Sequence, residues 1–393
     1  MQRVVFIFLI CTATFAQNYQ TGKVIDSISV SNNTKETFTM YLPDSFDPGS
    51  ESPVVFIFDP GAQGKRGIRP FIKASEKYGY ILICSNHTKN GPYDRNFEIT
   101  NRLFEFIFAN FKIKQNEMYV SGFSGGSRLA AAIAVLTNQI AGVVGCGAGF
   151  SQEQAHIPTF QQFSYVGVCG NRDMNYQEMI HAKGYLQKLN FTNTLITYDG
   201  NHTWPPDDQI LAAFDWLETQ AHLKGIKDIE ADELYKSYEK VCRTALKAEE
   251  NNDLLIAVEN YERAINTYNS FYKLDSVSDR LKKIHHSKSY KSLLKSVSKI
   301  FDKEKQLTRK LTSRIFEDYK SPDQIDIAWW EKELNKLEKI NKNDDPETEK
   351  MLERLKYQLF ATSYAVNQIS NTKSNEKQEE LTGMIRKLAF RKK

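Results

Sequence analysis

A serine stands between glycines in the stretch VSGFSGGSRLAAA, residues 120–132. Residues 122–126, Gly-Phe-Ser-Gly-Gly, fit the pattern G-x-S-x-G, with an apolar run before them and an alanine-rich run after them. A nucleophilic Ser124 would have to project from a strained strand-to-helix turn, and flanking glycines remove Cβ atoms that would clash there. Ordinary strand-to-helix turns also carry this pattern. It therefore predicts a nucleophile only if the chain supplies a base and an acid.

Two later segments supply a base and an acid. A serine hydroxyl is a weak nucleophile at neutral pH and needs a histidine that a carboxylate holds in one tautomer. Asp173 comes shortly after the strand-like run FSYVGVCG, and His202 comes shortly after the run TLITYDG. Functional groups gather at the carboxyl ends of the strands in an α/β sheet, here in the order serine, acid, histidine. We therefore predict that Ser124, Asp173 and His202 form a catalytic triad.

Other histidines and carboxylates are weaker candidates for these roles. His87 follows an earlier strand-like run, where it either lines the substrate cleft or is a solvated loop residue. The histidines in loop or helix patterns are expected at the surface: His156, His181 and His222. Three other carboxylates lie near the base: Asp199, Asp207 and Asp208. The first is too close along the chain to orient the imidazole, and the other two are typical of a helix start.

The negative charge that develops on an attacked carbonyl oxygen needs N–H donors. The N–H of Gly125 is one, because it lies at the start of the helix after the serine, where the helix dipole also favours negative charge. The second donor is expected in residues 59–64, DPGAQG, after another strand-like run. Pro60 has no N–H, so Gly61 or Ala62 is the expected donor. A simple turn is the alternative interpretation of this loop.

A sheet is needed to bring these groups together. Apolar or alternating runs typical of strands occupy residues 23–30, 36–42, 52–60, 80–85, 117–123, 141–147, 163–170 and 194–199. Helical patterns lie between or after them, at residues 69–78, 96–111, 125–136, 176–189 and 207–223. Strands that alternate with helices predict an α/β fold in which helices cover both faces of a mostly parallel sheet.

With these motifs, residues 22–224 resemble the α/β-hydrolase superfamily, and within it secreted esterases of the polyhydroxybutyrate depolymerase and feruloyl esterase type. The resemblance rests on the segments VSGFSGG, GNRD, GNHTWPP and FDPGAQG. It implies acyl transfer without a metal or organic cofactor, on an ester of a small molecule or of a polysaccharide. It also implies that Trp204 walls the pocket or lies buried under its loop, and Phe123 is a further candidate substrate contact.

Two departures from the family pattern are visible. Family members commonly have His-Gly where this chain has Asp59 and Pro60, which puts the shape of the acyl pocket in doubt. The short intervals between the strands leave no room for a large lid, which argues against a lipase that opens at an oil interface.

The second half of the chain has a different character. Residues 225–393 lack strand-like runs, carry most of the Lys and Arg, and predict an all-helical domain after a hydrolase domain at residues 17–224. Residues 231–268 resemble one tetratricopeptide-type hairpin, and further helices follow. The basic segment 280–310 is either the solvated face of a helix or a contact for an anionic surface such as polysaccharide or phospholipid. Its apolar stripe would be Leu281, Ile284, Leu293, Leu294, Val297 and Ile300.

The net charge, the first residues and the cysteines indicate which partners, location and thiol state to expect. The net charge is +4 from 52 basic and 48 acidic residues, which gives no reason to expect nucleic acid as a partner. Residues 1–16 predict a cleaved export signal, and hence a periplasmic or extracellular protein. Cys84, Cys146 and Cys169 lie in apolar runs and are expected as buried free thiols. No metal-ligand spacing occurs.

Two other classes of function remain open. In one, the protein is a secreted binding or scaffold protein with a degenerate hydrolase fold and acts through its helices. In the other, it is a serine peptidase. The intact triad favours an enzyme, and the lack of an acidic pair to hold a free N-terminus favours an esterase.

Overall fold

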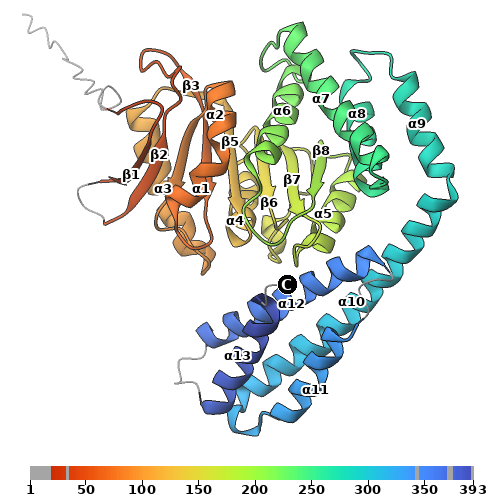
Figure 1. Cartoon of the computed structure of the whole chain (residues 1–393). Coiled ribbons are helices and arrows are strands. Elements are labelled where there is room, and N and C mark those ends of the chain that lie inside the picture. Colours follow the sequence, from red (N-terminus) through yellow and green to blue (C-terminus); the bar gives the residue numbers. More distant parts are fainter. Residues whose placement is uncertain (1–18, 32–34, 341–344, 370–374, 391–393) are drawn as a thin grey trace, which may run out of the picture.

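The computed structural model describes residues 19–31, 35–340, 345–369 and 375–390. The expected export signal, residues 1–16, lies outside these ranges and stays a prediction. The described residues form a sheet with helices on both faces, a group of helices beside it, and a helical bundle at one end of the strands (Figure 1). Among the described residues, no helix combines the length and apolar character needed to cross a membrane.

Eight strands form one sheet in the order β1-β2-β4-β3-β5-β6-β7-β8. They are β1 (Val24–Ser29), β2 (Thr37–Tyr41), β3 (Ser52–Phe58), β4 (Ile81–Ser85), β5 (Ile113–Phe123), β6 (Gly142–Cys146), β7 (Ser164–Gly170) and β8 (Asn193–Tyr198). Strand β2 is antiparallel to β1 and β4, and the remaining pairs are parallel. Each predicted strand run forms a strand, so the predicted mostly parallel sheet is confirmed.

The helices between the strands divide over the two faces. One face packs against α1 (Gly64–Ile68), η2 (Arg69–Phe71), α2 (Ile72–Tyr78) and α6 (Asp207–Leu223). The other packs against α3 (Tyr93–Asn110), α4 (Gly125–Thr137) and α5 (Tyr176–Lys188). Alternate residues of β3 belong to different cores, Val54 to one and Val55 to the other. A strand buried on both faces in this way reads as a continuous apolar run.

Three helices, called the side group here, follow the sheet: α7 (Ala231–Glu250), α8 (Leu254–Tyr268) and α9 (Asp275–His286). Helices α7 and α8 share a core and are joined by a turn that contains Asn251 and Asn252, and the likeness to a tetratricopeptide-type hairpin stays a prediction. Helix α8 lies along β8, the last strand of the sheet. Glu259 accepts hydrogen bonds from the N–H of Thr197 (2.9 Å) and from its hydroxyl (2.8 Å), and Arg263 donates to the carbonyl of Leu195 (2.8 Å). These bonds use the backbone groups that a sheet edge would otherwise leave open.

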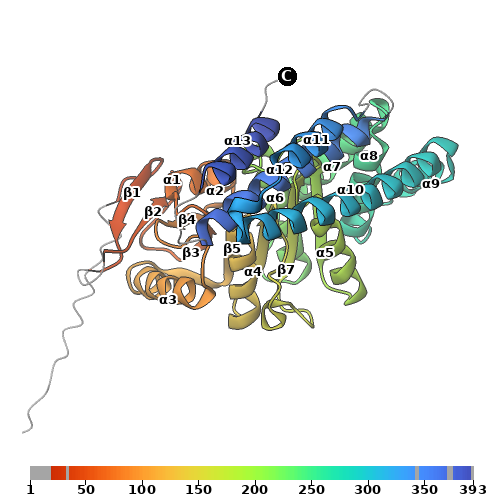
Figure 2. The same cartoon turned by 90° about the horizontal axis from the view of Figure 1, so that it is seen from below.

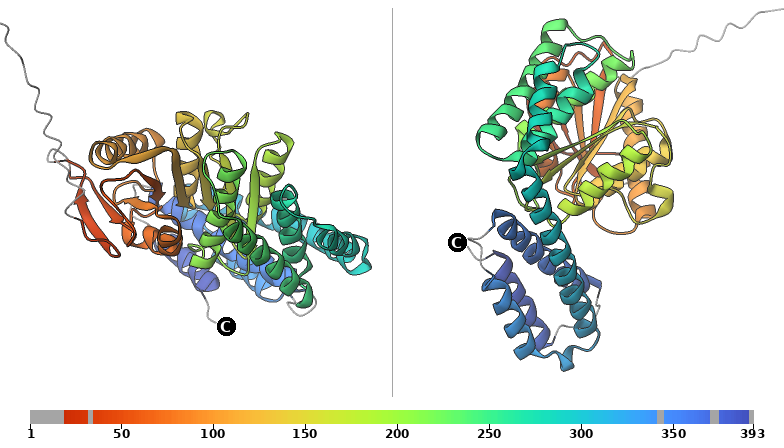
Figure 3. Two further views of the ribbon diagram at one scale, coloured as in Figure 1. Left: turned by 90° about the horizontal axis from the view of Figure 1, so that it is seen from above. Right: turned by 90° about the vertical axis from the view of Figure 1, so that its right-hand side faces the viewer.

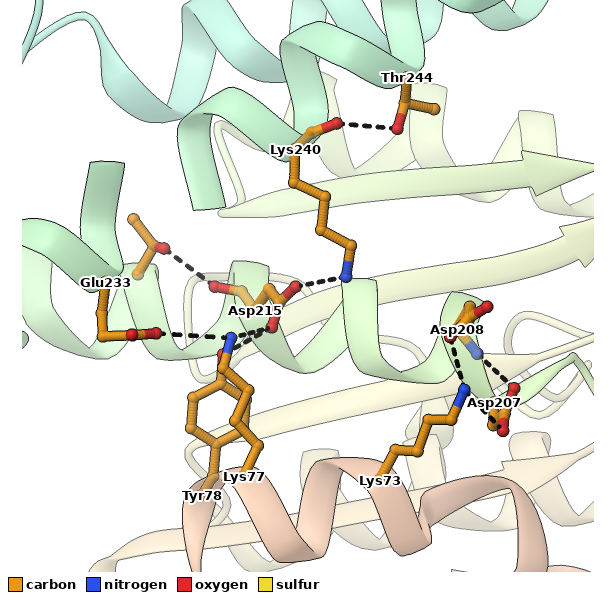
Figure 4. Close-up of polar contacts among 10 residues, drawn as sticks. Lys73, Lys77, Tyr78, Asp207, Asp208, Asp215, Glu233, Lys240 and Thr244 are labelled. Carbon is orange, nitrogen blue, oxygen red and sulfur yellow. Dashed lines mark hydrogen bonds and ion pairs between the residues drawn. The ribbon is translucent and has the colours of Figure 1, made fainter. Parts of the chain in front are cut away.

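A polar network also joins the side group to the sheet's helices (Figure 4). The buried carboxylate of Asp215 in α6 accepts hydrogen bonds from Lys77 (3.0 Å) and Tyr78 (2.6 Å) of α2 and from Lys240 (2.9 Å) of α7. A buried charge is tolerated when partners of opposite charge and hydrogen bonds surround it. Asp215 therefore ties three helices together. Burial, followed by the charge of this carboxylate, raises the pKa of the Tyr78 hydroxyl.

Four further helices, called the bundle here, complete the described chain: α10 (Lys288–Lys320), α11 (Ile327–Glu338), α12 (Pro346–Ile369) and α13 (Glu376–Phe390), with the short η4 (Pro322–Gln324) between α10 and α11. The bundle has its own core, built around Trp330, Leu355 and Ile385. The helices after Gly225 therefore contribute two separate cores. Figures 2 and 3 show the bundle lying across one end of the sheet.

Most local predictions for the second half hold, with one correction. The predicted apolar stripe of residues 280–310 includes Leu294, but this side chain is 43% exposed, while Ile284 and Ile300 are buried in different cores. A single stripe cannot serve both, because α10 leaves one core and enters another. Cys84, Cys146 and Cys169 are buried and unpaired as predicted.

Candidate active site

Ser124 lies between β5 and α4 in a backbone conformation that residues with a side chain rarely adopt (φ 53°, ψ −119°). Such strain persists only where the surroundings impose it, and it is common at functional sites. The glycines explain how the turn fits. A Cβ on Gly122 would collide with the carbonyl group of Gly126, and a Cβ on Gly126 would collide with the carbonyl group of Phe58 in β3. The motif therefore lets α4 pack directly against the strand ends.

The three residues of the predicted triad meet at this turn. His202 Nε2 lies 3.0 Å from Ser124 Oγ, and His202 Nδ1 lies 2.8 Å from Asp173 Oδ1. Asp173 is 1% exposed and also accepts a 2.8 Å hydrogen bond from the N–H of Asn175. With its Nδ1 proton donated to the carboxylate, the imidazole presents a lone pair at Nε2 to the serine hydroxyl. This arrangement can remove the serine proton and return it to a leaving group.

The loop that carries Asp173 and the loop that carries His202 are hydrogen-bonded to each other. The N–H of Asn171 donates to the carbonyl of Tyr198 (2.8 Å), and that of Arg172 donates to the carbonyl of Gly200 (2.9 Å). A Cβ on Gly170 would strike the carbonyl group of Gly200. The acid loop, residues 170–173, therefore fits closely against the histidine loop, residues 199–205.

The rival residues lie as follows. Asp199 pairs with Arg172 (2.8 Å), and both Asp207 and Asp208 pair with Lys73, as Figure 4 shows. None of the three therefore faces the imidazole. His181 is exposed as predicted. His156 is not a surface residue: it is 5% exposed, lies 3.0 Å from the hydroxyl of Ser151, and packs on two aromatic rings. His222 is also partly buried, against Phe271.

The predicted oxyanion donors are only partly available. The N–H of Gly125 starts α4 beside Ser124. In contrast, the N–H of Gly61 donates to Asp59 Oδ1 (2.8 Å), and that of Ala62 donates to the carbonyl of Asp59 (3.1 Å). Asp59 lies where members of the family that this chain resembles commonly have histidine. Its carboxylate accepts the hydrogen bond from the N–H of Gly61 in the same loop. Both amides already have acceptors, so the second donor at Gly61 or Ala62 stays a prediction.

A side-chain amide lies beside the first donor. A Cβ on Gly125 would collide with the side-chain amide of Asn90, whose oxygen Oδ1 faces Gly125 more closely than its donor Nδ2 does. The Asn90 N–H donates to the carbonyl of Pro60 (3.0 Å), which ties this residue to the predicted oxyanion loop. Sequence reasoning missed Asn90, although the loop that carries it follows β4 at the same edge of the sheet.

A cavity of about 290 Å³ opens beside Ser124. It is lined by Phe58, Asp59, Pro60, Thr88, Lys89, Asn90, Gly91, Tyr93, Asn96, Ser124, Gly125, Gly126, Arg128, Leu129 and Met174. His87 does not line this cavity and is partly buried in the loop after β4, so its role stays open. The cavity is lined by both polar and apolar groups, which suits a small polar substrate at least as well as a long acyl chain.

Phe123 packs on the imidazole, Trp204 packs on Phe123, and neither residue lines this cavity. The ring of Phe123 lies 4.6 Å from that of His202 and 5.4 Å from that of Trp204. The indole N–H of Trp204 donates to Asp59 Oδ2 (2.8 Å), and its ring meets Phe71 edge-on. Of the two predicted roles for Trp204, burial under its loop describes most of its contacts. Its remaining surface lines a second cavity, with Lys65, Arg66 and Arg69.

The bundle also reaches the site, which the sequence did not predict. Helix α12 lies across the carboxyl ends of the strands (Figure 2). The ring of Tyr357 is 5.2 Å from that of His202. Burial, followed by the charge of Asp173, raises the pKa of the Tyr357 hydroxyl, and Arg66 opposes this. A helix remote in the sequence thus closes one side of the imidazole.

The order of the elements decides the fold class. The turn at Ser124 follows the fifth strand, and Asp173 and His202 follow the seventh and eighth strands. The chain has an α/β-hydrolase fold. No protein-family model matches it, and neither does any curated protein. Among the described residues, no group of three or more His, Cys, Asp or Glu could hold a metal ion.

Solved structures with a similar fold include serine hydrolases and esterases. S-formylglutathione hydrolase (FrmB) from Staphylococcus aureus is 14% identical, with 50% of this chain and 96% of that chain covered, at a TM-score of 0.41. FphF, a fluorophosphonate-binding serine hydrolase from the same organism, is 14% identical, with 50% and 99% covered, at a TM-score of 0.44. The feruloyl esterase module from Clostridium thermocellum is 12% identical, with 47% and 83% covered, at a TM-score of 0.39.

Proposed function

We propose that the protein is a serine hydrolase that cleaves carboxylic esters through an acyl-enzyme. The observation that carries the proposal is the hydrogen-bonded series from Ser124 through His202 to the buried Asp173. In this mechanism His202 takes the proton of Ser124 as its oxygen attacks the ester carbonyl, and then gives that proton to the departing alcohol. Water, activated by the same imidazole, releases the acid.

We propose that the oxyanion is held by the N–H of Gly125 and by Nδ2 of Asn90, once the side-chain amide of Asn90 turns this donor toward the substrate oxygen. The support is the position of Asn90 next to Gly125 and the engagement of the Gly61 and Ala62 amides by Asp59. Loss of one such donor costs roughly 10²- to 10³-fold in kcat. If Asn90→Ala retained more than half of the wild-type kcat, the second donor would have to be a backbone amide of the loop at residues 59–64.

Ser124→Ala tests the proposal as a whole. We expect a loss of roughly 10⁴-fold or more in the hydrolysis of p-nitrophenyl acetate, because the acyl-enzyme can no longer form. A fluorophosphonate probe should label the wild type at Ser124 and leave the variant unlabelled. Ser127→Ala is the matched control: this hydroxyl lies three residues further on, in α4, and donates to the carbonyl of Ala148 (2.6 Å), so labelling should persist.

The same probe separates an enzyme from a binding protein with a degenerate hydrolase fold. A folded wild type that takes no label and hydrolyses no ester would favour the binding protein.

For an active enzyme, esters with acyl chains of increasing length would define the substrate range. We expect preference for short chains because the cavity beside Ser124 holds only about 290 Å³. Cleavage of peptides in preference to esters would instead indicate a serine peptidase.

A further inference from the structure

Helix α12 presents two different faces. One carries Met351, Leu352, Leu355 and Leu359, which are buried in the core of the bundle. The other carries Arg354 and Tyr357, which lie three residues apart and therefore on the same side of the helix. This second face meets the hydrolase part of the chain at the acid loop and at His202.

Arg354 is completely buried and bonds in two directions. Its Nε and Nη2 atoms donate to the carboxylate of Glu304 in α10, with Nε at 2.9 Å and Nη2 at 2.6 Å, so its charge is matched within the bundle. Its Nη1 atom donates to the carbonyl of Asn171 at 2.8 Å. The guanidinium also lies 5.5 Å from the ring centres of Tyr176 in α5 and Phe301 in α10. A planar, forked donor can make all of these contacts at once, whereas a lysine could not.

The acceptor of this bond is two residues before the catalytic acid. Asn171 is held from the sheet side by its N–H bond to Tyr198 and from the bundle side by Arg354. The next residue, Arg172, adds a longer ion pair with Glu349 of α12 (3.8 Å). The bundle thus fixes the segment that determines where the carboxylate of Asp173 points.

The second contact is with the base. The imidazole of His202 lies between the ring of Phe123 at 4.6 Å and the ring of Tyr357 at 5.2 Å. Tyr357 in turn packs on Phe360 of α12 and Phe390 of α13. The base therefore has one aromatic neighbour from the sheet and one from the bundle.

We propose that the bundle is a built-in part of the active site, in which Arg354 is a positioning residue that holds the acid loop against His202, and Tyr357 covers the imidazole. Where turnover is the measurement, this inference rests on the proposed esterase function. The bundle is then neither a separate binding module nor a detachable lid, because its buried arginine is bonded to the catalytic loop itself.

The test replaces the buried ion pair as a unit. Arg354→Met alone would leave Glu304 buried without a partner and could unfold the bundle, so the variant to measure is Arg354→Met with Glu304→Leu. Apolar side chains of similar volume can replace a buried ion pair without loss of stability. We expect kcat to fall roughly 10- to 100-fold with KM nearly unchanged, because a misplaced carboxylate weakens the transition state and not substrate binding.

The chain offers a matched control. Arg263 of α8 is also buried, pairs with Glu259 and donates to a carbonyl, that of Leu195, but this carbonyl lies on β8 away from the triad. Arg263→Met with Glu259→Leu should leave kcat within twofold of the wild type. If both double variants lost the same activity, or if neither did while remaining folded, the positioning role of Arg354 would be wrong.

A readout that does not need turnover separates this inference from the proposed function. The proton on His202 Nδ1, bonded to Asp173, should give a downfield proton NMR signal that Asp173→Asn abolishes. We expect the Arg354 double variant to weaken or shift this signal, and the Arg263 double variant to leave it unchanged. An unaltered signal in the folded Arg354 double variant would overturn the inference, whatever the result with Ser124→Ala.

Discussion

The side group and the bundle use the same device at two places. Each carries a buried arginine that is paired with a glutamate and donates to a backbone carbonyl of the sheet or its loops: Arg263 with Glu259 in the side group, and Arg354 with Glu304 in the bundle. The difference is the carbonyl that each one reaches. Leu195 belongs to the edge strand β8, so the first contact covers a sheet edge. Asn171 belongs to the acid loop, so the second reaches the active site.

These two regions show that the role of a buried ion pair depends on which group its arginine contacts outside the pair. Its net contribution to stability is small or negative, because desolvation offsets the attraction between the charges. What it provides is direction, since a guanidinium held on one side by a carboxylate presents its remaining N–H groups at a fixed angle. The side group is therefore expected to govern stability, and the bundle to govern catalysis. The following predictions test that division.

The largest effect is expected at the acid itself. Asp173→Asn should lower kcat roughly 10⁴-fold, because the imidazole loses its orientation and its correct tautomer. Combined with Arg354→Met and Glu304→Leu, it forms a double-mutant cycle. If the arginine acts through the acid loop, its replacement should cost little more once Asp173 is lost. Fully additive losses in kcat would show that the bundle acts on the site by another route.

A smaller effect, on stability alone, is expected where the side group meets α6. Asp215→Asn should lower the free energy of unfolding by about 2 kcal/mol, because the lysines and the tyrosine that donate to this carboxylate lose their charged acceptor. Urea denaturation would measure the loss, and kcat/KM of the folded variant should equal that of the wild type. Asp208→Asn is the control, because its ion pair with Lys73 is exposed and should matter little.

The same substitution of one tyrosine in each region tests the division between stability and catalysis. Tyr357→Ala should lower kcat/KM roughly tenfold at most, the size expected for one lost aromatic contact on the imidazole. Tyr238→Ala removes a ring of the side group that packs on Tyr268 and Tyr272, and it should lower the melting temperature without changing kcat/KM. Steady-state kinetics and thermal unfolding of both variants separate the outcomes. A loss of activity in the Tyr238 variant would contradict the division.

The meeting of Ser124, Asp173 and His202 could be predicted because each of these residues leaves a local signal. Gly122 reflects a close contact with Gly126 four residues further on, and the strand-like runs before Asp173 and His202 reflect burial on both faces of a sheet. Chain order then placed the three groups at one edge. Strands such as β3, β4 and β6 were predictable for the same reason, since a strand buried on both faces is a continuous apolar run, whereas the exposed β1 gives an alternating run.

The contacts of the bundle could not be predicted in this way. Arg354 and Asn171 are 183 residues apart, and nothing in the run ETEKMLERLKYQLF distinguishes a buried arginine from a solvated one. The engagement of the Gly61 amide by Asp59 is likewise invisible, because it depends on how a side chain turns back on its own loop. His156 was misplaced because a loop pattern does not reveal the aromatic pocket that packs around it.

The smallest effect should come from within the bundle but away from the site. Hydrogen bonds from Lys310 and then Lys336 hold the pKa of the buried Glu333 below its ordinary value. Such a carboxylate stabilises the folded state above the pKa it has when unfolded, and that contribution is lost as the pH falls through its folded pKa. Glu333→Gln should therefore lower stability by less than about 1 kcal/mol near neutral pH, since both lysines are half exposed, and by nothing in strong acid.

Unfolding of this variant and of the wild type at about pH 7 and about pH 3 would measure the difference. The value of kcat/KM at neutral pH should not change, because Glu333 touches neither Arg354 nor Tyr357. The outcome decides what a catalytic loss in the Arg354 double variant means. If a slightly weakened bundle with its arginine intact keeps full activity, then the position of the acid loop, and not the stability of the helices, limits turnover. If activity falls with stability, the bundle acts only by remaining folded.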